Sequence, residues 1–234
     1  MSTTVSCKEM AHDWAEAYAS DAQKRQELTY PTETLVRLFR GDYVTGEQLH
    51  LDGKSVLDVG FGAGNNTIYL ASLGMNVYGV EIHQSICDQL ENKLSQLGMS
   101  ADLRVGENRS LPFPDNSFDY LVSWNVLHYE GTEKNICEGI KEYSRVLKKG
   151  GRLFLSTTGP THKILLNSKT LGNHCYQIGR PNDFREGQQH FFFDATNYIE
   201  FYFAPSFKEL QIGRIEDSLF REKLDWWLVT GIKE

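Results

Sequence analysis

The stretch VLDVGFGAGN, residues 56–65, decides the fold of this 234-residue chain. A short apolar run leads into three glycines spaced G-x-G-x-G, and a helical pattern follows them. This order predicts a buried strand, a tight turn and a helix whose first N–H groups are free to bind a ligand. The spacing differs from the G-x-G-x-x-G of pyrophosphate-binding turns, and Asp58 would place a negative charge beside a diphosphate. Both features favour a cofactor without phosphates.

A second signal is the acidic residue that ends the next apolar run, Val77-Tyr78-Gly79-Val80-Glu81. Glu81 follows the first glycine of the turn by about twenty residues, a spacing at which a carboxylate can accept both hydroxyls of a ribose. The alternative is a solvated glutamate at the end of a strand. Together with the glycine turn, Glu81 predicts a ribose-containing cofactor.

Residues 55–157 alternate short apolar runs with helical patterns, as is typical of a parallel sheet with crossover helices. After Thr158 this rhythm breaks, and two late strands with no room for a helix between them must pair antiparallel. The predicted fold class is therefore α/β, a Rossmann-like three-layer sandwich with a seven-stranded, mostly parallel sheet and a C-terminal antiparallel hairpin. The expected strands are 55–59, 76–80, 102–105, 118–124, 152–157, 210–215 and 226–232, and the expected helices are about 65–73, 84–97 and 133–147.

The chain contains no internal repeat or low-complexity linker that would divide it, so we expect a single domain over residues 1–234. Within it we expect an N-terminal helical cap (1–50) and a cofactor-binding core (52–158). A lid or substrate insertion (159–208) and the terminal antiparallel strands (209–234) complete the domain.

Composition excludes several classes of function. The net charge of −7 repels a phosphate backbone, and no dense run of Lys and Arg offsets it, so no nucleic-acid partner is expected. The four cysteines show no CxxC spacing and no grouping with histidines, which argues against disulfides and against a metal site. There is no signal peptide and no apolar run of membrane-spanning length. We expect a cytoplasmic protein with no membrane contact, either a monomer or a homodimer.

Four segments together resemble the class I S-adenosylmethionine-dependent methyltransferases, most closely the type 11 small-molecule group. The resemblance extends from about Asp52 to Thr157. Its most specific part is a Gly-Glu pair followed by Leu111-Pro112-Phe113 and then by Phe118-Asp119 at the start of a strand. The segments are VLDVGFGAG (56–64), VYGVE (77–81), VGENRSLPFPDNSFDYLVSWNVLHY (105–129) and VLKKGGRLFLST (146–157).

The resemblance implies S-adenosyl-L-methionine as the cofactor and suggests which residues bind it. Glu107 would receive the adenine amino group, although aspartate is commoner there, and Asn108 would offer its backbone N–H to the ring. Asn125 would lie near the methionine part. Asn65 is either a helix cap or a contact to the methionine carboxylate, and Arg37 is either a partner of that carboxylate or a surface residue. The predicted cofactor contacts are Tyr30, Arg37, Asp58, Gly60, Gly62, Gly64, Asn65, Glu81, Ile82, Glu107, Asn108 and Asn125.

Methyl transfer from a sulfonium is an in-line displacement that needs alignment and, for a protonated nucleophile, a base. His128 and His190 are the candidate bases because histidine titrates near neutral pH, and Tyr129 should face the reacting centre with His128. The alternative for His128 is capping and packing at the end of a strand. Arg180 or Arg185 could hold a substrate carboxylate by a two-pronged hydrogen bond. The predicted substrate contacts are Tyr18, Tyr176 and Arg180.

The favoured function is methyl transfer from S-adenosylmethionine to a small-molecule acceptor. The alternative is an enzyme that acts on S-adenosylmethionine itself, a cyclase or lyase that releases methylthioadenosine, because its cofactor motifs would be identical. A non-enzymatic cofactor-binding subunit is less favoured because the motifs are intact. An NAD-dependent oxidoreductase conflicts with the glycine spacing and the terminal hairpin.

Overall fold

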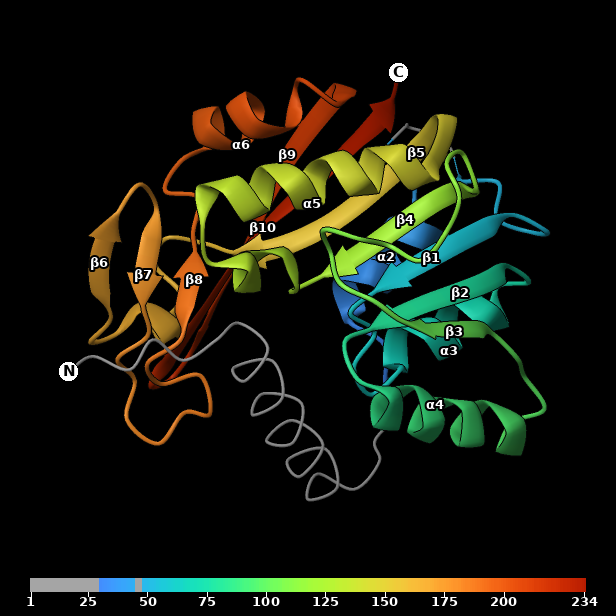
Figure 1. Ribbon diagram of the computed structural model, residues 1–234, viewed down its shortest axis with the longest axis horizontal. Coiled ribbons are helices and arrows are strands. Elements are labelled where there is room, and N and C mark those ends of the chain that lie inside the picture. The colour runs from blue at the N-terminus through green and yellow to red at the C-terminus, as the bar shows by residue number, and fades with distance from the viewer. Residues whose placement is uncertain (1–29, 45–47) are drawn as a thin grey trace.

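The computed structural model describes residues 30–44 and 48–234 of the chain. Their main feature is a seven-stranded sheet with the strand order β3-β2-β1-β4-β5-β10-β9 (Figure 1). β1 to β5 run parallel to one another, whereas β10 pairs antiparallel with both β5 and β9. The predicted fold class is confirmed. The strands are β1 Ser55–Val59, β2 Asn76–Glu81, β3 Asp102–Val105, β4 Phe118–Trp124, β5 Leu147–Thr158, β9 Phe207–Leu219 and β10 Glu222–Lys233.

Three strands are several residues longer than the sequence predicts, and β2 is longer by one residue. β5 begins at Leu147 rather than at 152, because Leu147 already pairs with Phe118; an irregular Lys-Lys-Gly-Gly segment follows, and pairing resumes at Arg152. β9 and β10 are also longer than the predicted 210–215 and 226–232. Their extra residues pair with one another in the hairpin, where charged side chains alternate on an exposed surface and resemble a turn in the sequence.

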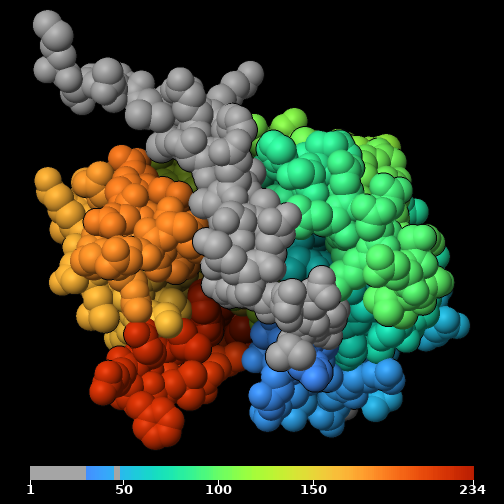
Figure 2. All heavy atoms as spheres, turned by 90° about the horizontal axis from the view of Figure 1, so that it is seen from below, coloured from blue at the N-terminus to red at the C-terminus, as the bar shows by residue number. Residues whose placement is uncertain are grey.

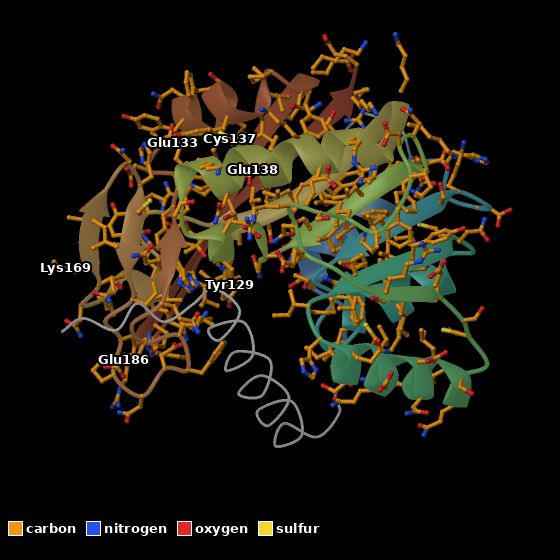
Figure 3. All side chains as sticks on the ribbon, viewed as in Figure 1. Tyr129, Glu133, Cys137, Glu138, Lys169 and Glu186 are labelled. Carbon is orange, nitrogen blue, oxygen red and sulfur yellow. The ribbon has the colours of Figure 1, made fainter. Side chains whose placement is uncertain are left out.

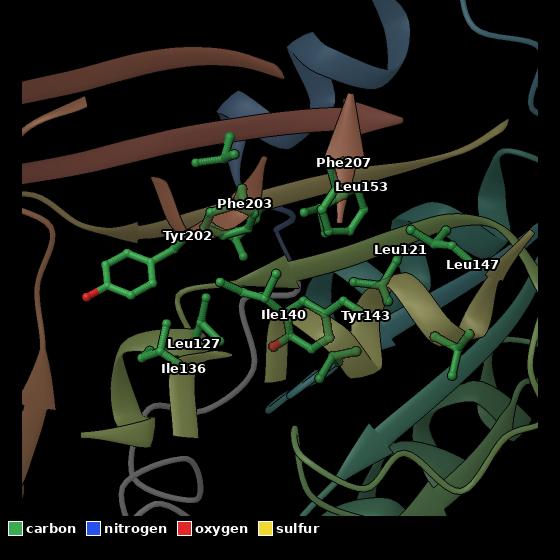
Figure 4. Packing of buried hydrophobic residues seen from close by; sticks show 14 of the residues in the cluster. Leu121, Leu127, Ile136, Ile140, Tyr143, Leu147, Leu153, Tyr202, Phe203 and Phe207 are labelled. Carbon is green, nitrogen blue, oxygen red and sulfur yellow. The ribbon is translucent and has the colours of Figure 1, made fainter. Parts of the chain in front are cut away.

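Both faces of the sheet are covered by helices, which makes three layers (Figure 1). Successive side chains of a strand point to opposite faces. Leu57, Leu121 and Leu153 therefore face α5 and α6 in one core, shown in Figure 4, while Val56 and Val122 lie in a second core with α2. The helices are α2 Glu33–Arg40, α3 Asn65–Ser72, α4 Gln84–Gln96, α5 Glu133–Val146 and α6 Thr196–Phe203, with short 3-10 helices η1 Leu127–Glu130 and η2 Lys163–Leu165.

The insertion after β5 contains regular structure that the sequence did not predict. A second, three-stranded antiparallel sheet is formed by β6 Lys169–Gly172, β7 Cys175–Gln177 and β8 Gln189–Phe191. These strands have three or four residues each, too few to show a period in the sequence. On the face drawn in Figure 2, the orange insertion and the teal-to-green part of the predicted cofactor-binding core lie on opposite sides.

The phenylalanine run at the end of β8 fixes the small sheet to the rest of the molecule. Phe191 and Phe193 are fully buried in the main core, and the indole N–H of Trp227 donates to the Phe193 carbonyl at 2.8 Å. Phe192 points the other way and packs with Ile164 and Ile178. All three phenylalanines are therefore core residues.

Only part of the predicted N-terminal cap can be compared with the structure. Residues 1–29 and 45–47, including Trp14 and the predicted substrate contact Tyr18, lie outside the described residues. The helical spacing of Leu35 and Phe39 is confirmed, because α2 buries both side chains against the sheet.

Candidate active site

The glycine turn joins β1 to α3 at the carboxyl edge of the parallel strands. Gly60, Gly62 and Gly64 all have positive φ, at 66°, 54° and 77°, a region that side chains other than glycine rarely adopt. A Cβ on Gly60 would also approach the Val126 side chain to 2.5 Å. Gly64 is the N-cap of α3, so Asn65 is the first helical residue and not the cap that was one of its two predicted roles.

Glu81, at the end of β2, accepts one backbone N–H bond on each carboxylate oxygen, one of them from the glycine turn. Oε1 accepts from the Gly62 N–H at 3.0 Å and Oε2 accepts from the Ile82 N–H at 2.8 Å. The side chain is only 3% exposed, and burial raises its pKa while the two N–H bonds oppose that rise. Each oxygen keeps a further lone pair, so this carboxylate fits a partner that donates two hydroxyls, such as a ribose.

Asp58, in the middle of β1, is buried beneath the turn and tied to the following helix. Its Oδ2 accepts from the Thr67 hydroxyl at 2.7 Å. Burial raises the pKa of this carboxyl to about 7, and the nearby charge of Glu81 adds to the rise. Asp58 therefore fixes the position of α3 relative to β1, and its predicted contact with the cofactor remains a prediction.

The predicted adenine contacts lie in the loop after β3. The carboxylate of Glu107 is 60% exposed and pairs with Arg109 at 3.3 Å, so it is accessible to a ligand. The side chain of Asn108 points inward: its Nδ2 donates to Glu130 at 2.9 Å and its Oδ1 accepts from the Tyr143 hydroxyl at 2.6 Å. This leaves only the backbone of Asn108 for the contact that the resemblance implies.

Asn125 follows β4 in the left-handed conformation, with φ at 61°. Its backbone N–H donates to Ser156 Oγ at 3.0 Å, and that hydroxyl donates to Asn125 Oδ1 at 2.6 Å. Non-glycine residues held in this way are concentrated at binding sites. Tyr30 and Arg37, by contrast, are largely exposed, and the Arg37 guanidinium pairs with Glu33 on the same helix.

The three predicted catalytic residues come together, although His190 lies far from the adjacent pair His128 and Tyr129 in the sequence. Ring centroids are 4.6 Å apart for His128 and Tyr129, 4.6 Å for Tyr129 and His190, and 5.4 Å for His128 and His190. η1 supplies the first two residues and β8 supplies His190, whose ring also lies near Phe192. Figure 3 labels Tyr129 where η1 faces the small sheet. We call these residues, together with Phe192, the histidine cluster.

Both histidines of the cluster are buried and neutral at pH 7. Burial is the largest cause, and the positive charge of Arg185 adds to it. Together they lower the pKa of His190 to about 3 and hold that of His128 well below its ordinary value. Nδ1 of His128 lies 3.4 Å from the Thr157 hydroxyl. Neutral imidazoles in such a place serve as hydrogen-bonding groups more readily than as proton acceptors.

The structure separates the two arginines that sequence reasoning treated as alternatives. Arg180 forms a two-pronged pair with Glu222, at 3.2 and 2.9 Å. Arg185 is instead the arginine beside the histidine cluster, where it forms a hydrogen bond with Tyr129. The Tyr176 hydroxyl donates to Asp194 at 3.3 Å.

His162 and Asp183 complete the surroundings of the cluster and were missed by sequence reasoning. Asp183 pairs with Arg185, and the charge of Arg185 also reaches His162. Both residues lie in segments without a period, so no pattern in the sequence marks them. Within residues 30–44 and 48–234, no group of three or more His, Cys, Asp and Glu side chains could hold a metal. No helix in that part of the chain is long and apolar enough to cross a membrane.

Comparisons with known proteins agree with this geometry. Residues 57–155 match the family model described as a methyltransferase domain. The chain is 34% identical over 119 residues to a biotin biosynthesis bifunctional protein of Cellvibrio japonicus, covering 51% of this chain and 22% of that protein. It is 29% identical over 148 residues to a ubiquinone biosynthesis O-methyltransferase of Coxiella burnetii, covering 58% and 62%. The chain thus spans less than two thirds of the length of these curated relatives.

A solved structure resembles the whole fold. It is the 1,6-didemethyltoxoflavin-N1-methyltransferase of Burkholderia thailandensis with bound 1,6-didemethyltoxoflavin and S-adenosylhomocysteine. The TM-score is 0.68 at 14% identity, covering 100% of this chain and 92% of that one. The family match places residues 57–155 in the methyltransferase domain family, and the strand order and this likeness give the described structure the fold of S-adenosylmethionine-dependent methyltransferases.

Proposed function

We propose that the protein transfers a methyl group from S-adenosylmethionine to a small-molecule acceptor that binds against the histidine cluster. The observation that carries this proposal is the clamp between Glu81 and the Gly62 N–H, in a domain that matches the methyltransferase family. The histidine cluster, which lies between η1 and β8 of the insertion, is suited to enclosing a small molecule. The bound 1,6-didemethyltoxoflavin of the structural neighbour supports the same class of acceptor.

In this proposal each part of the carboxyl edge has one role. Glu81 accepts the ribose hydroxyls, Glu107 and the Asn108 backbone meet the adenine, and Asn125 lies beside the methionine part. In this proposal, the other predicted contacts with the cofactor surround these four residues. S-Adenosylmethionine supplies an electrophilic methyl group on sulfur. The protein aligns the acceptor with that methyl group and excludes water, and alignment alone is worth about 7–11 kcal/mol of the barrier.

The first test is cofactor binding by two variants, measured by isothermal titration calorimetry with S-adenosylhomocysteine. Glu81→Gln keeps the shape of the side chain but loses the charge that strengthens its hydrogen bonds, so we expect about tenfold weaker binding or more. Gly62→Val should abolish binding, because a β-branched residue resists positive φ and adds atoms to the turn. Glu91→Gln, an exposed change on α4, is the matched control. Unchanged affinity in Glu81→Gln would remove the proposed ribose site.

The second test is mass spectrometry of the products formed with S-adenosylmethionine, first alone and then with a metabolite extract. We expect no turnover without an acceptor, and S-adenosylhomocysteine together with one methylated compound when the extract is added. Methylthioadenosine formed without any acceptor would overturn the proposal, because it would mean that the cofactor itself is cyclised or cleaved.

A further inference from the structure

The guanidinium of Arg185 lies beside the histidine cluster and forms a hydrogen bond with Tyr129. Nε and Nη2 of Arg185 donate to the two carboxylate oxygens of Asp183, each at 2.7 Å. The two side chains are 18% and 11% exposed. Because Asp183 grips one edge of the planar guanidinium, the orientation of Arg185 is fixed. Both residues come from the loop between β7 and β8, where Figure 3 labels Glu186.

Two buried ring nitrogens near this guanidinium are unpaired, an arrangement that is rare in folded proteins. His162 accepts from the Ile164 N–H through Nδ1 at 3.1 Å, so its proton is on Nε2, which meets no acceptor among the described residues. His190 points Nε2 at Gln188 Oε1, 3.4 Å away. The Gln188 amide is oriented by its own bond to the Phe184 carbonyl at 3.4 Å. His190 Nδ1 is therefore a lone pair without a donor among the residues described.

The charges around the cluster favour an anion over a second cation. Arg185 acts on His128, His190 and His162, and it lowers the pKa of each. Asp183 is its ion-pair partner, Tyr129 is a hydrogen-bonding neighbour, and Arg180 is a further cation that acts on His162 and Arg185. A proton placed on either cluster histidine would form a buried imidazolium that is repelled by the guanidinium of Arg185. An oxyanion in the same place is attracted.

We propose that the acceptor is a small organic acid that binds as an oxyanion, a carboxylate or a phenolate, with Arg185 as its counter-ion. This inference rests on the proposed function. A lone pair of the oxyanion forms the new O–C bond, the C–S bond breaks, and its electron pair stays on sulfur. The sulfonium and the oxyanion both become neutral, so the step transfers no proton to a histidine. The Nε2–H of His162 donates to the oxyanion, and the Nδ1 lone pair of His190, which can only accept, takes a donor from another part of the ligand.

The test uses simple probes on the protein loaded with S-adenosylhomocysteine, by isothermal titration calorimetry at pH 7.5. Benzoate tests a carboxylate and 4-nitrophenolate tests a phenolate, while benzamide is a neutral molecule of the same shape as benzoate. We expect at least one of the two anions to bind about tenfold more tightly than benzamide. That preference should be lost in Arg185→Met and kept in Arg221→Met, an equivalent change at the exposed turn between β9 and β10.

Two further variants separate charge from folding. Arg185→Met leaves the Asp183 carboxylate unpaired, so the double variant Asp183→Asn, Arg185→Met removes both charges together. Arg185→Lys keeps the charge but loses the two-pronged geometry and should retain part of the preference. Circular dichroism and S-adenosylhomocysteine affinity, expected to stay within about twofold of the parent, show that each variant is folded.

The outcomes distinguish this inference from the function on which it rests. Equal affinity of both anions and benzamide for the parent protein, or a preference that survives in the double variant, overturns the oxyanion site. Failure of the parent protein to bind S-adenosylhomocysteine overturns the proposed function instead. ¹⁵N spectra of the histidine rings give an independent readout. The bound anion should shift the His162 Nε2 signal, and an unchanged signal would place the anion elsewhere and overturn the assignment.

Discussion

Two buried carboxylates on the neighbouring strands β1 and β2 have different hydrogen-bond partners. Glu81 and Asp58 are both buried, but Glu81 accepts two backbone N–H bonds, whereas Asp58 has one hydroxyl partner, Thr67. Fewer hydrogen bonds to the charged form leave Asp58 with the stronger preference for its proton. Asp58, which orients α3, thus also has a pKa of about 7.

Asp58 predicts a specific pH dependence of stability. Its pKa is raised from 3.8 to about 7 in the folded state, so its contribution is fully present below about pH 4 and is lost as the pH rises through 7. The lost contribution is about 4 kcal/mol, at about 1.36 kcal/mol for each pKa unit. In urea unfolding without cofactor, the parent protein should lose about this much stability relative to Asp58→Asn between pH 4 and pH 8. A constant difference between the two proteins would contradict the prediction, and Asp88→Asn, on the exposed face of α4, is the control.

At the scale of elements, a single buried carboxylate, Asp225, joins the antiparallel hairpin to the start of the insertion. Asp225 of β10 accepts from the N–H and hydroxyl of Thr161, at 2.7 and 2.6 Å, and from Nε and Nη2 of Arg214 on β9, at 2.8 and 2.9 Å. It also leaves no room for a side chain at Gly159, where a Cβ would lie 2.4 Å from Asp225 Oδ1. One residue therefore joins β9, β10 and the start of the insertion.

Replacing Asp225 should loosen this junction. Asp225→Ala is expected to cost about 3 kcal/mol, at the low end for a broken buried ion pair because Arg214 is partly exposed and can be rehydrated. Asp217→Ala, in the exposed part of the same hairpin, should change stability by less than about 0.5 kcal/mol. Guanidinium unfolding followed by circular dichroism compares the two variants. An equal effect of both would show that the Asp225 network does not stabilise the hairpin.

The sequence predicted the elements whose ends are marked by a change of residue type. β1, β3 and β4 have the bounds that their apolar runs indicated, because Gly60, Gly106 and Asn125 end these runs. The small sheet could not be predicted, since its short strands are defined by pairing with one another and by docking on η1. The same reason applies to the site. The position of Glu81 beside the glycine turn follows from parallel pairing of neighbouring strands, whereas the approach of His190 to His128 depends on that docking.

At the scale of the whole molecule, the insertion and the predicted cofactor-binding core (52–158) share one hydrophobic cluster. Phe191 and Phe193 pack in the same cluster as Leu57 of β1 and Ile140 of α5. The insertion is therefore not a separate unit attached to the sheet, and its residues contribute to the stability of the whole described structure. The single domain stays a prediction, which a substitution in this core can test.

Phe191→Ala tests that shared core. Truncating a fully buried phenylalanine is expected to cost about 3–5 kcal/mol. If the core is shared, the tryptophan fluorescence and far-ultraviolet circular dichroism transitions should move together to lower denaturant concentration. Phe201→Ala, an exposed change on α6, should leave both in place. A separate early transition in Phe191→Ala would show that the insertion unfolds by itself.

The end of β8 has a consequence for how this protein could acquire new chemistry. Alternate residues divide the work: Phe191 and Phe193 anchor the strand in the main core, while His190 and Phe192 point into the cluster. Substitutions at 190 and 192 can therefore change the histidine cluster while Phe191 and Phe193 keep the backbone in place. They also lie far from the glycine turn in the sequence. Selectivity can diverge here, by natural drift or directed evolution, without rebuilding the machinery that binds the donor.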